Sequence, residues 1–364
     1  MNVFKRAILI SAVAALLIGG ILTVGGIAPR HALSYAVAGP AEKRTDRLLS
    51  VPAPALPPRE RERAPAVTEP DGEPETEPPA TDDPTPDDAP TQTESNEGPA
   101  NTQPVDLPAG AKKIVTKTYP SSLSVNNVSG VEIDEAALLK HLPAIDLSGD
   151  GPQILIVHTH TMEAYHETGE DYYFKEDVRS SDPEHNMVHV GEILGQTLTR
   201  RGYRVVHCTT VHDEDFNRAY SRSNRSIRDY LERYPSISVV IDLHRDSLID
   251  GKGTKYRPVT VIDGEETAQV MLLMGVGGAP YPHPEWKENL AFALRIQQTA
   301  MEQYPGLMRP VFVRASRYNQ NLTHGSILVE LGACGNTLPE AERAARRFGE
   351  VLALTLDRLR EARQ

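Results

Sequence analysis

The sequence predicts an α/β protein with a mostly parallel mixed sheet flanked by helices, and two observations predict this class. From about residue 111 onwards, short apolar runs typical of buried strands alternate with stretches in which apolar residues recur at helical spacing. Repeated strand–helix–strand order is typical of parallel sheets with helices on both faces. We therefore expect residues 111–364 to form one domain without internal repeats.

The elements of this domain are expected in alternating order. Strands are expected at 154–158, 203–208, 237–243, 258–262, 268–275, 310–314 and 326–331. Helices are expected at 185–200, 217–233, 287–304 and about 337–360, with a short one near 135–142. Gly202 is placed to end a helix, and Thr337 with Glu340 forms a capping-box pattern. Asp263-Gly264 predicts a tight turn between two strands.

The first residues of the chain predict a membrane anchor. Residues 7–28 are mostly apolar and carry no charge. This run is long enough to cross a bilayer as a helix. Lys5 and Arg6 precede this run, so the positive-inside rule places the N-terminus in the cytoplasm. A cleavable signal peptide is the alternative, since residues 36–38 resemble a cleavage site. We expect residues 1–30 to be an uncleaved single-pass anchor, with the domain outside the cytoplasm.

Residues 31–110 predict a disordered linker. Its portion 51–110 holds 15 of the 29 prolines, with 14 acidic and 3 basic side chains, a net charge of −11. Because so few apolar residues are present, this segment cannot offset the entropy of ordering its chain. The full chain has a net charge of −12, so the other residues sum to −1, and no nucleic-acid partner is expected. The two cysteines, Cys208 and Cys334, are expected to be free structural thiols rather than a disulfide.

Imidazoles and carboxylates follow three of the expected buried strands. His160 and Glu163 come after the strand at 154–158, His244 ends the strand at 237–243, and Glu330 ends the third. The carboxyl ends of parallel strands share one edge of a sheet, where ligands bind. Two imidazoles and a carboxylate suit a hydrolytic zinc ion. We expect the rings of His160 and His244 to lie within about 5 Å of each other, close enough to share an ion.

We assign each side chain a role on this basis. His160, Glu163 and His244 are the expected zinc ligands, and Glu330 is the expected general base. Arg245 could hold a substrate carboxylate or stabilise an oxyanion.

Other polar residues compete for these roles. His158 could be a ligand or could orient one, and Asp242 and Asp246 are candidate carboxylates behind His244. His212-Asp213 and His324 could line the cleft. A single histidine at a strand end is most often a satisfied polar residue, so the metal hypothesis depends on the combination of three strand ends.

The chain resembles the stage II sporulation protein P family of endospore-forming bacteria. Four segments carry the resemblance, at residues 154–165, 186–191, 240–247 and 317–337. Met162 departs from the family pattern, in which a small polar residue is usual. The resemblance also makes Glu184 the alternative if Glu163 is not the carboxylate ligand.

The resemblance implies a fold and an activity. That family is similar to zinc N-acetylmuramoyl-L-alanine amidases, with a sheet like that of zinc carboxypeptidases. It implies cleavage of peptidoglycan between N-acetylmuramic acid and the L-alanine of the stem peptide, with additional endopeptidase activity. It also implies a role in septal wall thinning and engulfment during sporulation, with stage II sporulation proteins D and M as partners.

Two other functions remain open from the sequence. One is a zinc peptidase that acts on stem peptides, and the other is a wall-binding scaffold without catalytic activity. The metal is open as well, because manganese or cobalt can take similar ligands.

Overall fold

The computed structural model describes residues 107–174 and 178–364, and its centre is a seven-stranded mixed sheet. In spatial order the strands are β2 (Val125–Asn127), β12 (Val311–Arg314), β9 (Val270–Gly275), β13 (Gly325–Ala333), β6 (Val239–Asp246), β3 (Ile154–Val157) and β5 (Val205–His207). Neighbouring strands of this sheet run parallel except β9 and β13. The expected mostly parallel mixed sheet is therefore confirmed.

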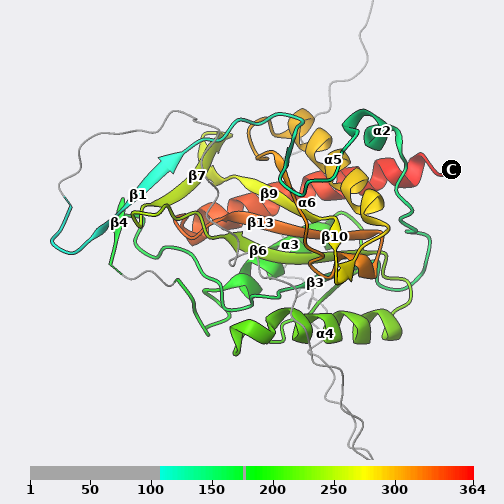
Figure 1. The fold of residues 1–364 in the computed structure, drawn as a ribbon, viewed down its shortest axis with the longest axis horizontal. Coiled ribbons are helices and arrows are strands. Elements are labelled where there is room, and N and C mark those ends of the chain that lie inside the picture. The colour runs from blue at the N-terminus through cyan, green and yellow to red at the C-terminus, as the bar shows by residue number, and fades with distance from the viewer. Residues whose placement is uncertain (1–106, 175–177) are drawn as a thin grey trace, which may run out of the picture. The chain divides into compact units, whose positions relative to one another are not determined.

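Helices cover both faces of the sheet (Figure 1). Apolar side chains of α3 (Met187–Arg200), α5 (Trp286–Gln303) and α6 (Leu338–Glu361) share one core with alternate residues of the central strands. α4 (Ala219–Arg233) lies against the opposite face, where its Ile227 and Tyr230 pack on Leu155 and Val240. Successive strand residues point to opposite faces. Asp242 and His244, two and four residues after Val240, therefore point to the α4 side.

The strands that carry the candidate residues end at the same edge. β3, β6 and β13 are mutually parallel, so their carboxyl ends lie side by side. The register pairs Glu330 of β13 with His244 of β6. Residues paired across neighbouring strands project to the same face. Glu330 and His244 are thus neighbours on the α4 side of the sheet.

A second sheet of four strands accounts for one difference from the expected elements. Its order is β4 (Tyr172–Tyr173), β1 (Lys112–Lys117), β7 (Lys255–Ile262) and β8 (Glu265–Ala268). Asp263 and Gly264 both have positive φ, as a two-residue hairpin turn requires, and join β7 to β8. The strand expected at 268–275 begins only at Val270, because the chain leaves the small sheet at β8 and enters the large one as β9.

The remaining elements are short. They are α2 (Glu135–Lys140), the hairpin of β10 (Gly277–Gly278) and β11 (Tyr281–Pro282), and the single turns η3 (Phe216–Arg218) and η4 (Gln320–Leu322). The capping box of Thr337 and Glu340 is present at the start of α6. Cys208 and Cys334 are buried and are not joined by a disulfide. The expected anchor lies outside the described residues, as does the linker up to residue 106. None of the described helices has the length and apolar content of a membrane span.

Candidate metal centre

The chain turns immediately after β3 and carries His160 and Glu163 toward β6. The backbone N–H of Glu163 donates to the carbonyl of His160 at 3.3 Å, which closes a single turn. The backbone N–H of Met162 donates to the carboxylate of Asp213, so the turn is also fixed from outside. This turn is the geometry that a spacing of three residues needs for both side chains to face one point.

His160 has a buried imidazole whose two nitrogens lack a hydrogen-bond partner among the described residues. Phe216 of η3 stacks on the ring at 4.4 Å between centroids, and Tyr220 of α4 meets it edge-on at 5.8 Å. Burial lowers the pKa of His160 to about 4, so the ring is neutral near pH 7. A neutral, buried imidazole has one nitrogen with an unused lone pair, which is suited to hold a cation.

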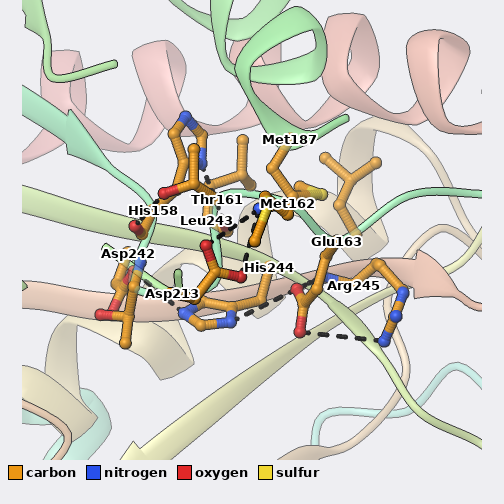
Figure 2. A network of polar contacts seen from close by, with 12 residues as sticks. His158, Thr161, Met162, Glu163, Met187, Asp213, Asp242, Leu243, His244 and Arg245 are labelled. Carbon is orange, nitrogen blue, oxygen red and sulfur yellow. Dashed lines mark hydrogen bonds and ion pairs between the residues drawn. The ribbon is translucent and has the colours of Figure 1, made fainter. Parts of the chain in front are cut away.

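His244 lies between two carboxylates, as Figure 2 shows. Its Nε2 is 2.9 Å from Oδ1 of Asp242, and its Nδ1 is 3.5 Å from Oε2 of Glu163. Burial alone would lower the pKa of His244, but the two carboxylates outweigh burial and raise it well above the usual value. Glu163 shows the converse, since burial raises its pKa while Arg245 and His244 together bring it down to about 2. Asp242 therefore takes the place expected for a carboxylate that orients His244.

Arg245 is buried, and its guanidinium binds protein groups. Its Nε donates to the carbonyl of Ala164 at 3.1 Å, and one terminal nitrogen donates to the carbonyl of Val178 at 3.2 Å. Its backbone N–H donates to Oε2 of Glu163 at 3.1 Å, while a terminal nitrogen lies 3.8 Å from Oε1. These contacts favour a role in orienting Glu163 over the direct substrate contact expected from the sequence.

Imidazole and carboxylate groups, as carried by His160, Glu163 and His244, are the donor types of hydrolytic zinc sites. The ring centroids of His160 and His244 are 5.3 Å apart, slightly more than the about 5 Å expected from the sequence. A ring centre lies about 3.2 Å from a zinc ion bound through nitrogen, so two rings on one tetrahedral ion have centres about 5.2 Å apart. The described residues contain no group of three or more His, Cys, Asp or Glu side chains already arranged around a metal position. Glu163 and Asp242 instead approach the two ring nitrogens of His244 directly.

The alternatives to these ligands lie elsewhere. His158 points to the α3 side, where its Nδ1 binds the carbonyl of Leu243 at 3.0 Å and its Nε2 meets Nε2 of His207 at 2.8 Å. β3 ends at Val157, so His158 and His160 do not share a face as a continued strand would require. Glu184 is exposed and lies 3.7 Å from His189.

Three further candidates are also accounted for. Asp246 pairs with Arg309 at 2.9 Å instead of His244, and His324 is exposed. His212 is buried, and its Nδ1 binds the carbonyl of His158 at 2.7 Å, so it supports the turn after β3 from behind.

The sequence interpretation missed the residues that enclose His160. Phe216 stacks on its ring, and the guanidinium of Arg179 lies 5.6 Å from the Phe216 ring. Arg179 also pairs with Asp213 at 2.8 Å. The one sequence feature that could have pointed to Phe216 is its location after the strand at 205–207. That feature is weak, because aromatic residues at the start of a helix are common in any core.

The centre is closed in this structure. His160 is 0% exposed, Glu163 2%, His244 1% and Glu330 3%. The fold and the site thus define an α/β protein with a buried His/Glu/His donor set at the carboxyl edge of its sheet.

The chain belongs to the stage II sporulation protein P family, whose sequence model matches residues 46–353. Stage II sporulation protein P of Bacillus subtilis (strain 168) is 28% identical over 223 residues, which are 58% of this chain and 53% of that protein. The chain therefore matches about half the length of that curated relative.

Solved amidase structures are similar to a lesser degree. The N-acetylmuramoyl-L-alanine amidase from Clostridium difficile 630 is 11% identical, with 59% of this chain and 100% of that chain covered and a TM-score of 0.36. The N-acetylmuramyl-L-alanine amidase Ami1 from Mycobacterium abscessus, in its apo form, is 12% identical, with 57% and 99% covered and a TM-score of 0.33. Likeness of this size leaves the activity to be argued from the site itself.

Proposed function

We propose that this chain is a zinc-dependent peptidoglycan hydrolase that cleaves the amide between N-acetylmuramic acid and the L-alanine of the stem peptide. The observation that carries the proposal is the buried imidazole of His160, whose nitrogens lack a protein partner among the described residues and whose ring faces His244. Membership of the stage II sporulation protein P family supports the choice of substrate.

His160, Glu163 and His244 would hold the metal. When bound there, zinc supplies Lewis acidity toward a carbonyl oxygen and lowers the pKa of a water molecule. Asp242 holds the ring of His244, and Arg245 holds the carboxylate of Glu163, so two of the three donors are fixed before any ligand arrives. Fixed donors reduce the reorganisation that binding and catalysis require.

Glu330 is the proposed general base. Its place beside His244 on the neighbouring strand puts a carboxylate next to the metal ligands on the same face. In this role Glu330 takes a proton from the attacking water and passes it to the nitrogen of the leaving amine. The scissile amide thereby becomes a lactyl carboxylate and a free stem peptide.

The setting of the activity is proposed on the family resemblance. The domain would act outside the cytoplasm on a single-pass anchor, in septal wall thinning and engulfment, with stage II sporulation proteins D and M as partners. Endopeptidase activity on cross-linked peptides is part of the same proposal.

Mass spectrometry of digested sacculi tests the reaction. Zinc-loaded parent chain should release free stem peptides that begin with L-alanine, while His244→Ala should release none. Shortened muropeptides without free stem peptides would identify a peptidase instead. Sacculi left intact by the zinc-loaded parent would favour a scaffold without catalytic activity.

A further inference from the structure

A buried chain of polar groups connects the candidate metal centre to the loop between β12 and η4. It begins at Asp242, which contacts Nε2 of His244 through Oδ1. Thr159 binds the same carboxylate twice, with its backbone N–H 2.8 Å from Oδ1 and its hydroxyl 2.6 Å from Oδ2. Both carboxylate oxygens are therefore tied to the residue that precedes His160.

The chain of polar groups continues to Ser223 on α4. The hydroxyl oxygens of Thr159 and Ser223 are 2.7 Å apart, and Nδ2 of Asn319 is 3.1 Å from the hydroxyl oxygen of Ser223. Thr159, Ser223, Asp242 and Asn319 are all buried. These contacts join segments 64 and 96 residues apart in the sequence.

Counting protons gives this chain a direction. A carboxylate only accepts, so the single hydroxyl proton of Thr159 goes to Asp242. Ser223 must then supply the proton of its contact with Thr159, although its hydroxyl also has the carbonyl of Tyr220 within 3.2 Å. Asn319 donates through Nδ2 to the Ser223 oxygen and to the same carbonyl, each at 3.1 Å. With the Thr159 proton on Asp242, one series of donors runs from Asn319 through Ser223 and Thr159 to Asp242.

Asn319 is itself held in an unusual backbone conformation. Tyr318 and Asn319 have φ of 50° and 55°, which is the left-handed region that residues other than glycine seldom adopt. Gln320 pins the loop to β9, accepting from the N–H of Gly275 and donating to the carbonyl of Leu273, both at 2.8 Å. Asn224 donates to Oδ1 of Asn319 at 2.8 Å, which fixes the orientation of its amide. Backbone strain that is held by so many contacts is typical of functional positions.

We propose that Asn319 is a positioning residue for the metal centre. Acting through Ser223, Thr159 and Asp242, it holds the His244 ring so that Nδ1 faces Glu163 and the metal position. The proposal rests on the proposed zinc function, because the metal is the ligand that this orientation serves. Hydrogen bonds behind a metal ligand fix its ring and set metal affinity, and their loss costs about 10–100-fold in affinity.

The test uses the full-length chain and variants that remove one link each. Ser223→Ala removes the middle hydroxyl, and Asn319→Gly removes the amide while keeping the left-handed backbone accessible. Thr159→Val removes a hydroxyl, and Thr159→Ser restores it. Ser226→Ala is the matched control. It also deletes a hydroxyl from α4, but that hydroxyl lies 2.8 Å from His212 and is not part of the chain of polar groups.

Two measurements are made on each variant. Competition with a zinc chelator gives the zinc dissociation constant, and nitrogen–proton NMR of the metal-free chain reports the Nε2–H of His244. Ser223→Ala, Asn319→Gly and Thr159→Val should weaken zinc binding about 10–100-fold. They should also shift or broaden the His244 signal. Ser226→Ala and Thr159→Ser should stay within about threefold of the parent.

The outcomes separate this proposal from the proposed function. Equal zinc affinity and an unchanged His244 signal in Ser223→Ala and Asn319→Gly would overturn the positioning role, as would a loss of thermal stability with unchanged zinc affinity. A parent chain that binds no zinc would end the proposed function, and the NMR signal would then decide the positioning role alone. Zinc binding without hydrolysis would leave the affinity comparison intact.

Discussion

At the scale of single residues, the environment of His160 differs from that of two other buried histidines. His158 and His212 use both ring nitrogens in hydrogen bonds, whereas the described residues leave His160 with none. A buried polar atom without a partner is costly, so a protein retains it only where another group satisfies it. This contrast is the reason to propose His160 as a metal ligand and not His158.

Removal of either imidazole should abolish tight zinc binding. Changes behind a ligand already cost about 10–100-fold, so His160→Ala and His244→Ala should each lose more than about 100-fold in affinity. Metal analysis of the purified chain after dialysis should find about one zinc ion in the parent and much less in either variant. His324→Ala, which removes an exposed imidazole, is the control. Full zinc content in His160→Ala would remove this residue from the ligand set.

Replacement of Glu330 should separate catalysis from binding. Glu330→Gln keeps the size of the side chain but cannot take a proton, so hydrolysis should slow by about 10²–10⁴-fold. Zinc content should stay at the level of the parent, because Glu330 is not one of the assigned ligands. Release of stem peptides from sacculi measures the rate. Glu265→Gln in β8 is the control, and undiminished hydrolysis by Glu330→Gln would require another base.

At the scale of elements, η3 and the start of α4 enclose the centre. Phe216 and Tyr220 cover the ring of His160, and Arg179 lies over Phe216. η3 has three residues, and its capping residue makes no side-chain hydrogen bond to it. η3 is therefore a short turn over a centre that is closed to solvent. Its displacement should expose the candidate ligands at the lowest cost in free energy.

Shortening Phe216 should make the centre easier to reach. An aromatic stacking contact contributes about 0.5–1.5 kcal/mol, which corresponds to at most about a tenfold change in the frequency of opening. Phe216→Ala should therefore release bound zinc to excess chelator several-fold faster than the parent, measured with a chelator whose colour reports zinc. Phe174→Ala removes an exposed phenylalanine and should release zinc at the parental rate. Equal release rates in all three chains would mean that η3 does not control access.

At the scale of the whole molecule, the centre joins elements that are distant in sequence. The turn after β3, β6 and the start of α4 contribute His160, His244 and Tyr220, and Arg245 connects β6 to the segment around Val178. A metal ion at this junction would add a tie among segments that the unfolded chain does not hold together. Zinc should therefore stabilise the folded domain as well as serve the reaction.

Removal of zinc should lower the thermal stability of the chain. Free zinc at about 100 times its dissociation constant contributes about 2.7 kcal/mol to the free energy of unfolding. For a domain of this size that corresponds to a fall in Tm of about 5–10 °C when a chelator removes the metal. Calorimetry before and after chelation, and again after zinc is restored, measures the shift. His160→Ala should show no such shift, and a parent Tm that ignores zinc would argue against a shared ion.

Much of the fold was accessible from the sequence because it depends on local patterns. The helices expected at 185–200 and 287–304 lie within two residues of α3 and α5, since apolar spacing and caps act over one or two turns. The small sheet was harder to foresee, because β1 pairs with β7, which lies far along the chain. The split of 268–275 between β8 and β9 likewise depends on which sheet each segment joins.

The sequence alone determined that imidazoles and carboxylates would gather at one edge of the sheet, because parallel strands end together and these residues follow their apolar runs. Which of these side chains face each other depends on contacts between distant segments. The end of β3 at Val157 turns His158 away from His160, and the register of β6 against β13 sets Glu330 beside His244. Asn319 joins the same network across the 96 residues that separate it from Ser223. Strand ends, register and loop docking are fixed by packing between distant segments, which no local pattern encodes.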